Sequence, residues 1–115
     1  MPSFEKSPPE LVARFDQVAA RFPEAERRQM FGYPCLFVGG NLVTGLHERR
    51  WMVRLPDAQR EALLAEPGAG PFEPMPGRAM KGYAVLPTAI IDDDAALDPC
   101  VSRAIEFGRT LPPKS

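Results

Sequence analysis

The segment from residue 35 to residue 43 constrains the fold most, because apolar strands flank a tight turn on both sides. CLFV precedes the glycine pair 39–40 and NLV follows it, and glycine tolerates the positive φ of a two-residue hairpin turn. Such a turn predicts the pairs Val38–Asn41, Phe37–Leu42 and Cys35–Thr44. Successive strand residues point to opposite faces, so a sheet with one wet face would alternate apolar and polar residues here. Both faces are therefore expected to be covered, by a helix of the same chain or by a second copy.

The remaining pattern predicts an α+β domain with about five strands and three helices. A β meander is expected over residues 27–55, with Trp51, Val53 and Leu55 on one face, and a last strand over residues 79–87. The first helix is expected to start with Ser7 as its cap, Pro8 at its first position and Glu10 completing a capping box. The other helices are expected over residues 57–66 and 99–111, the latter with Asp98 as its cap and Pro99 at its first position.

Chain length and net charge limit the kinds of protein that this sequence can encode. The 115 residues are expected to form a single domain, 1–115, and the formal net charge of −1 provides no overall attraction for polyanions. No run is long and apolar enough for a signal peptide or a membrane span, which predicts a cytoplasmic protein with reduced cysteines. No cofactor is expected.

The loop over residues 67–78 contains four prolines and three glycines and precedes the last strand. One interpretation is a stiff segment that packs Phe72 and Met75 against the core while Arg78 and Lys81 project outward. The other is a partner-binding patch made of the same four residues, because long loops are uncommon unless they are functional or compactly packed. The packing interpretation is the favoured one.

Two other function classes remain open as alternatives. Five arginines at or near strand ends could contact nucleic-acid phosphates, although carboxylates interleave with them: Arg27, Arg28, Arg49, Arg50 and Arg54. A thiol enzyme would depend on Cys35, but the predicted register leaves the single histidine, His47, three residues beyond the strand position opposite that cysteine. The acidic run Asp92–Asp94 lacks the ligand spacing of a calcium loop, so no metal site is predicted.

Three segments resemble the TfoX/Sxy N-terminal domain family, and they occur in the family's order. They are RRQMFGYPCLFVGGNLVTGLHERRWMVRLP, PGAGPFEPMPGRAMKGYAVLP and a final helix that ends in LPPK. The resemblance implies a curved antiparallel sheet packed with helices, as in secretion chaperones, and no catalytic residues. It also implies a regulator of natural competence or transcription that acts through partner proteins. The separate C-terminal helical domain of full-length regulators is expected to be absent.

The hypothesis from sequence is therefore a non-enzymatic interaction or regulatory module that binds a protein partner, and a homodimer is a second hypothesis. Its candidate partner-binding residues are Phe72, Met75, Arg78 and Lys81, with Arg49, Arg50 and Arg54 as a polar rim.

Overall fold

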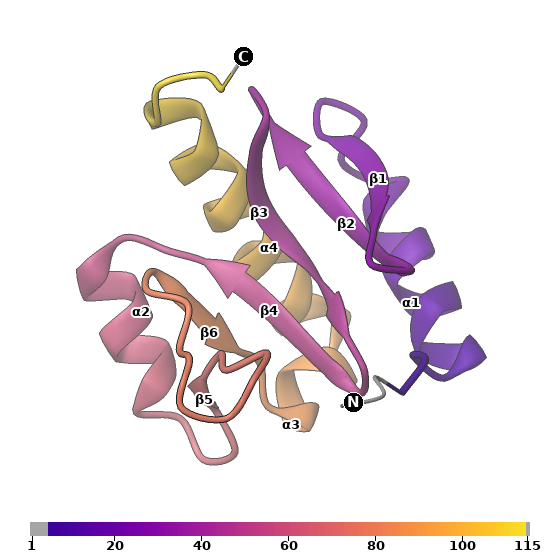
Figure 1. Ribbon diagram of the computed structural model, residues 1–115, viewed down its shortest axis with the longest axis vertical. Helices are drawn as coiled ribbons and strands as arrows, with labels where there is room; N and C mark the ends of the chain where they lie inside the picture. Colours follow the sequence, from indigo (N-terminus) through magenta and orange to yellow (C-terminus); the bar gives the residue numbers. More distant parts are fainter. Residues whose placement is uncertain (1–4, 115) are drawn as a thin grey trace.

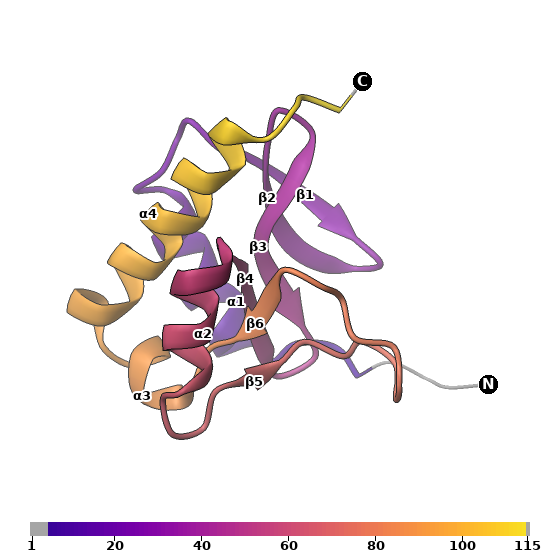
Figure 2. The ribbon, with the colours of Figure 1, turned by 90° about the vertical axis from the view of Figure 1, so that its left-hand side faces the viewer.

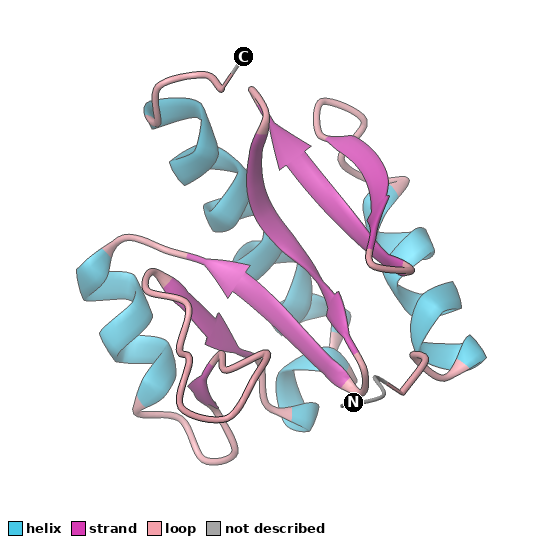
Figure 3. Ribbon diagram, viewed as in Figure 1, coloured by secondary structure: helices cyan, strands magenta, loops and turns pink. Residues whose placement is uncertain are grey.

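The computed structural model describes residues 5–114, which form a six-stranded antiparallel sheet and four helices (Figures 1 and 3). The sheet order is β1-β2-β3-β4-β6-β5. Along the chain the elements are α1 (Pro9–Ala19), β1 (Glu26–Met30), β2 (Tyr33–Val38), β3 (Asn41–His47), β4 (Arg50–Arg54), α2 (Asp57–Leu64), β5 (Gly70–Pro71), β6 (Tyr83–Val85), α3 (Thr88–Ile91) and α4 (Asp94–Thr110). The α+β prediction is confirmed. The counts differ because the two-residue strand β5 and the one-turn helix α3 carry too few residues for a periodic signal.

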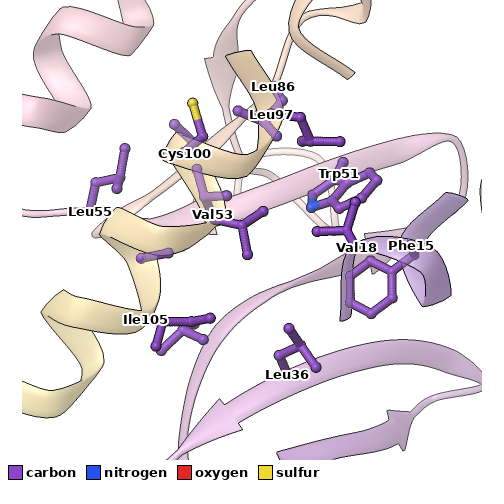
Figure 4. Packing of buried hydrophobic residues seen from close by; sticks show 14 of the residues in the cluster. Phe15, Val18, Leu36, Trp51, Val53, Leu55, Leu86, Leu97, Cys100 and Ile105 are labelled. Atoms are coloured by element: carbon purple, nitrogen blue, oxygen red, sulfur yellow. The ribbon is translucent and has the colours of Figure 1, made fainter. Parts of the chain in front are cut away.

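The two faces of the sheet are covered differently. Figure 2 shows the helices on one side of the sheet and the orange segment that follows β5 on the other. The helical side holds the larger apolar cluster, to which α1 contributes Phe15 and Val18 and α4 contributes Leu97, Val101 and Ile105 (Figure 4). We call the sheet face opposite the helices the second face. Among residues 5–114, no helix is long and apolar enough to cross a lipid bilayer.

The helical face is organised around Trp51, which is fully buried on β4. Its ring lies 5.1 Å from that of Phe15, centroid to centroid. Its indole N–H donates to Thr44 Oγ1 at 2.9 Å, and that hydroxyl donates to the carbonyl oxygen of Met52 at 2.7 Å. Every polar atom of this buried group therefore has a partner, as a core position requires.

The predicted hairpin register is right at the turn and wrong at Cys35. Val38 pairs with Asn41 and Phe37 with Leu42, as expected, but Cys35 pairs with Gly45 instead of Thr44. A β-bulge between the pairs Phe37–Leu42 and Leu36–Thr44 adds one residue to β3. A register extrapolated from the turn cannot include such an insertion.

Two predicted helix starts are also wrong. Pro8 is the cap of α1 and makes no side-chain bond, while the Ser7 hydroxyl donates to the carbonyl oxygen of Glu48 at 2.6 Å. Helix α4 starts at Asp94, because the Asp93 carboxylate accepts from the Ala95 N–H at 3.0 Å, and Pro99 lies inside the helix. Asp98, the predicted cap, lies within the helix, and its carboxylate accepts instead from the Arg21 guanidinium at 2.8 Å.

Candidate functional site

The second face is partly covered by residues 72–82, which we call the strap. Phe72 is buried, and its ring packs edge-on against that of Tyr83 at 6.4 Å between centroids. Backbone N–H groups of the strap donate to its own carbonyl groups, from Met80 to Phe72 and from Arg78 to Met75, each at 2.9 Å. The strap is thus an ordered segment of the fold, as the packing interpretation expects.

Arg50 fixes the strap to the hairpin formed by β3 and β4. Its Nη1 donates to the carbonyl oxygen of Glu73 at 2.8 Å, and its guanidinium lies 5.7 Å from the centroid of the Phe72 ring. Its Nη2 lies 2.7 Å from His47 Nδ1 and 3.2 Å from the Glu48 carboxylate. Arg50 therefore holds several groups in place, although the sequence suggested only a surface rim residue.

The protonation state of His47 follows from this contact. A guanidinium has donors and no acceptor, so His47 Nδ1 accepts and its proton resides on Nε2. Burial, followed by the charge of Arg50, lowers the pKa of His47. The imidazole is therefore neutral near pH 7, and its ring packs between Tyr33 at 5.0 Å and Phe72 at 5.6 Å.

Between the strap and the sheet lies a cavity of about 240 Å³, which we call the pocket. No residue that lines it carries a formal charge, and the lining includes all four methionines of the described part of the chain. The lining residues are Met30, Phe31, Tyr33, Cys35, Leu42, Leu46, His47, Met52, Phe72, Pro74, Met75 and Met80. Three larger hollows are lined in part by charged side chains such as Glu66, Arg60 and Lys6, and two of them border the pocket, at Met80 and at Phe31. Flexible, polarizable methionines suit a binding surface that adapts to an apolar group.

Cys35 lies in the lining of the pocket, opposite Gly45. A Cβ at position 45 would lie 2.6 Å from Cys35 Sγ and 3.1 Å from Met52 Cε, so only glycine leaves room for these two side chains. Burial raises the pKa of the Cys35 thiol to about 11. The thiol is therefore protonated at neutral pH and is a poor nucleophile.

Phe31 lies at the rim of the pocket and was not among the residues predicted to form a site. It forms the two-residue turn between β1 and β2 together with Gly32, and both have positive φ, at 54° and 84°. A left-handed backbone costs a residue other than glycine roughly 1–2 kcal/mol. The Phe31 side chain is 85% exposed, so burial within the chain does not offset this cost. The sequence signal that could have identified this turn is the dipeptide Phe-Gly between two strands, because two-residue turns with positive φ favour Asn-Gly.

The other residues predicted to contact a partner do not all lie around the pocket. Met75 is 43% exposed at the pocket rim, while Phe72 is a buried anchor. Arg78 and Lys81 are exposed, and neither forms an ion pair with any residue between 5 and 114. Arg54 lies over the rings of Tyr83 and Phe107, at 5.6 and 6.0 Å.

The remaining strand-end arginines do not form a free basic surface. Each has a carboxylate partner: Arg27 with Asp16 at 2.8 Å, Arg28 with Glu26 at 2.7 Å, Arg49 with Glu5 at 3.7 Å and Arg50 with Glu48 at 3.2 Å. These pairs are exposed or only partly buried, so they reduce the positive charge that this surface presents to a phosphate backbone without removing it. In the described chain, no group of three or more His, Cys, Asp or Glu side chains is arranged to hold a metal ion.

The fold and this site define a class: an α+β domain with an open antiparallel sheet, one face under helices and the other under a proline-rich strap. The family model described as the TfoX N-terminal domain matches residues 16–108. The chain belongs to this family. Comparison with curated proteins and with solved structures gave no match.

Proposed function

We propose that the protein is a non-enzymatic regulatory module of the TfoX type that acts in the cytoplasm by binding a protein partner through its second face. The observation that carries the proposal is the uncharged pocket with Phe31 and Met75 exposed at its rim. Exposed apolar groups around a recess are typical of an interaction site. Membership of the TfoX N-terminal family supports a regulatory role, such as control of competence or transcription.

The chemistry of the second face supports binding more than catalysis. Cys35 contributes the only thiol of the pocket lining, and burial keeps it protonated. The imidazole of His47 is already engaged by Arg50, so it has a structural role beside the strap. An apolar recess of this kind can hold a side chain and exclude water from it.

The exposed cations of the strap give the surface a polar edge. Arg78 follows Met75 across a tight turn, and Lys81 follows Met80, so both charges lie next to residues that line the pocket. A carboxylate of a partner protein could pair with either cation, because neither forms an ion pair with any residue between 5 and 114. Charged rim groups of this type chiefly affect the association rate and the choice of partner.

The test compares capture of partners from the native cytoplasm by three forms of the protein. The first is the wild type, and the second is the double variant Arg78→Glu/Lys81→Glu. The control is Arg103→Glu/Lys114→Glu, which changes the net charge equally at exposed positions outside the strap. Recovered proteins are quantified by mass spectrometry after reversible cross-linking.

We expect the strap variant to lose proteins that the wild type and the control variant both retain, by tenfold or more. Identical recovery by all three forms would contradict a binding role for this face. A Phe31→Ser variant provides an independent check, because the exposed ring can be removed without creating a core cavity.

A further inference from the structure

We propose that the partner at the pocket is a second copy of this chain, and that each copy inserts Phe31 into the pocket of the other around a twofold axis. This inference rests on the proposed function, because it names the occupant of the same face. Three independent observations support it: the conformation of Phe31, the size of the pocket and the closeness of the two.

The conformation of Phe31 is unfavourable in the isolated chain. Both central residues of its turn have positive φ, a geometry in which Asn-Gly is favoured and an aromatic residue is disfavoured. The ring is 85% exposed, so it makes little contact within its own chain. Strained backbone held in this way is commonly part of a functional site. Burial of the ring by another molecule would offset the free-energy cost of this backbone conformation.

The pocket has room for one large side chain. Its volume is about 240 Å³, below the roughly 300–1,000 Å³ of small-molecule sites. The methionines and the rings of Tyr33 and Phe72 surround it, and thioethers make favourable contacts with aromatic rings. A phenyl ring inserted into this lining could contact both the thioethers and the aromatic rings.

The position of Phe31 makes the surface complementary to itself. Phe31 lies at the rim of the pocket, so the projecting ring and the recess belong to one patch of the surface. A twofold axis through such a patch places each ring at the other copy's recess and closes the assembly at two copies. A head-to-tail contact would instead produce rings or open chains.

Local charges on this face are balanced within the chain only in part. Arg28 is paired with Glu26 at 2.7 Å, and Arg50 is paired with Glu48 at 3.2 Å. Arg28 and Arg50 are thus balanced within each chain, whereas Arg54, Arg78 and Lys81 have no carboxylate partner among residues 5–114. Added salt, which screens their mutual repulsion, should therefore strengthen the dimer. Met75, half exposed at the rim, extends the apolar contact area beyond the ring.

The test is sedimentation equilibrium from 1 to 200 µM. We expect the wild type to have twice the chain mass of 12.7 kDa in the upper part of this range. Phe31→Asn removes the ring and supplies a residue that the turn favours, so the variant should fold well and weaken dimerisation at least tenfold. The matched control is Leu64→Asn, which removes the exposed apolar side chain of α2 and should leave the dimer unchanged.

Mixing two defective variants tests reciprocal insertion. Met75→Trp adds volume at the pocket rim and keeps Phe31, whereas Phe31→Asn keeps the pocket and lacks the ring. Each variant alone should be monomeric, and an equimolar mixture should form dimers that retain one of the two insertions. Circular dichroism of each variant verifies that it is folded.

Three results would overturn the inference: a monomeric wild type throughout the concentration range, a Phe31→Asn variant with the wild-type dimer affinity, or a mixture that stays monomeric while the wild type dimerises. A monomeric wild type combined with loss of captured proteins in Arg78→Glu/Lys81→Glu would leave the proposed function standing, with a different protein as the partner.

Discussion

Substituting Gly108 by alanine sets two effects of opposite sign against each other in helix α4. In a helix interior, alanine is favoured over glycine by about 1 kcal/mol. A Cβ at position 108 would lie 2.5 Å from Val43 Cγ1 and 3.1 Å from Val38 Cβ, both below normal contact distance. Valine side chains are stiff at χ1 and Val43 is fully buried, so the helix itself must move. Overpacking of this kind costs about 1–3 kcal/mol.

The net expectation for Gly108→Ala is a loss of about 1 kcal/mol in the free energy of unfolding. With an unfolding entropy of about 2 cal/mol/K per residue, that loss lowers the melting temperature of a 115-residue domain by roughly 4 °C. Urea denaturation and calorimetry measure both quantities. In a Val43→Ala background the closer of the two contacts is removed, so the same substitution should cost less or be neutral, with a coupling energy of about 0.5–3 kcal/mol. A Gly108→Ala variant as stable as the wild type, with no coupling to position 43, would refute the packing argument.

Three further predictions concern buried groups on the two faces. Because burial raises the pKa of Cys35 to about 11, stability should fall between pH 9 and 11, by roughly 2–3 kcal/mol, and this loss should be smaller in Cys35→Ala. At pH 8, iodoacetamide should modify Cys35 slowly in the folded protein and rapidly in urea. The lowered pKa of His47 gives the opposite pH dependence. The contribution of the neutral imidazole to the free energy of unfolding is complete above pH 6.5 and is lost as the pH falls through the folded pKa. In urea melts, His47→Gln should therefore lose less stability in acid than the wild type. Thr44→Val leaves the indole N–H of Trp51 without its acceptor and should cost about 1–3 kcal/mol by denaturant unfolding; an unchanged midpoint would contradict the assigned bond.

Local rules predicted the elements whose signals lie within a few residues. The apolar stripe of the first helix, the glycine pair at residues 39–40 and the strands around them follow from periodicity and turn chemistry. The bulge that adds Val43 to β3 could not be predicted in this way. It depends on how β3 fits against its neighbours, which only the assembled sheet determines.

The candidate site was predicted in part. The proline-rich loop was recognised as an ordered strap anchored by Phe72, and the apolar second face followed from strand alternation. The pocket itself joins residues from five separate segments, so no single stretch of sequence encodes it. Phe31 was missed because an aromatic residue between strands resembles a core position. Its exposure follows from the left-handed turn, which the dipeptide Phe-Gly indicates only weakly.

The most direct test of the second face as the contact surface is NMR spectroscopy of the protein labelled with ¹³C at its methionine methyl groups. Met30, Met52, Met75 and Met80 all line the pocket, so they report on its occupancy. We predict that their signals shift or broaden as the protein concentration rises from 10 to 500 µM, or when native cell extract is added, and that Phe31→Asn suppresses the concentration-dependent change. Methionine signals that remain unchanged under both conditions would contradict a binding role for this face.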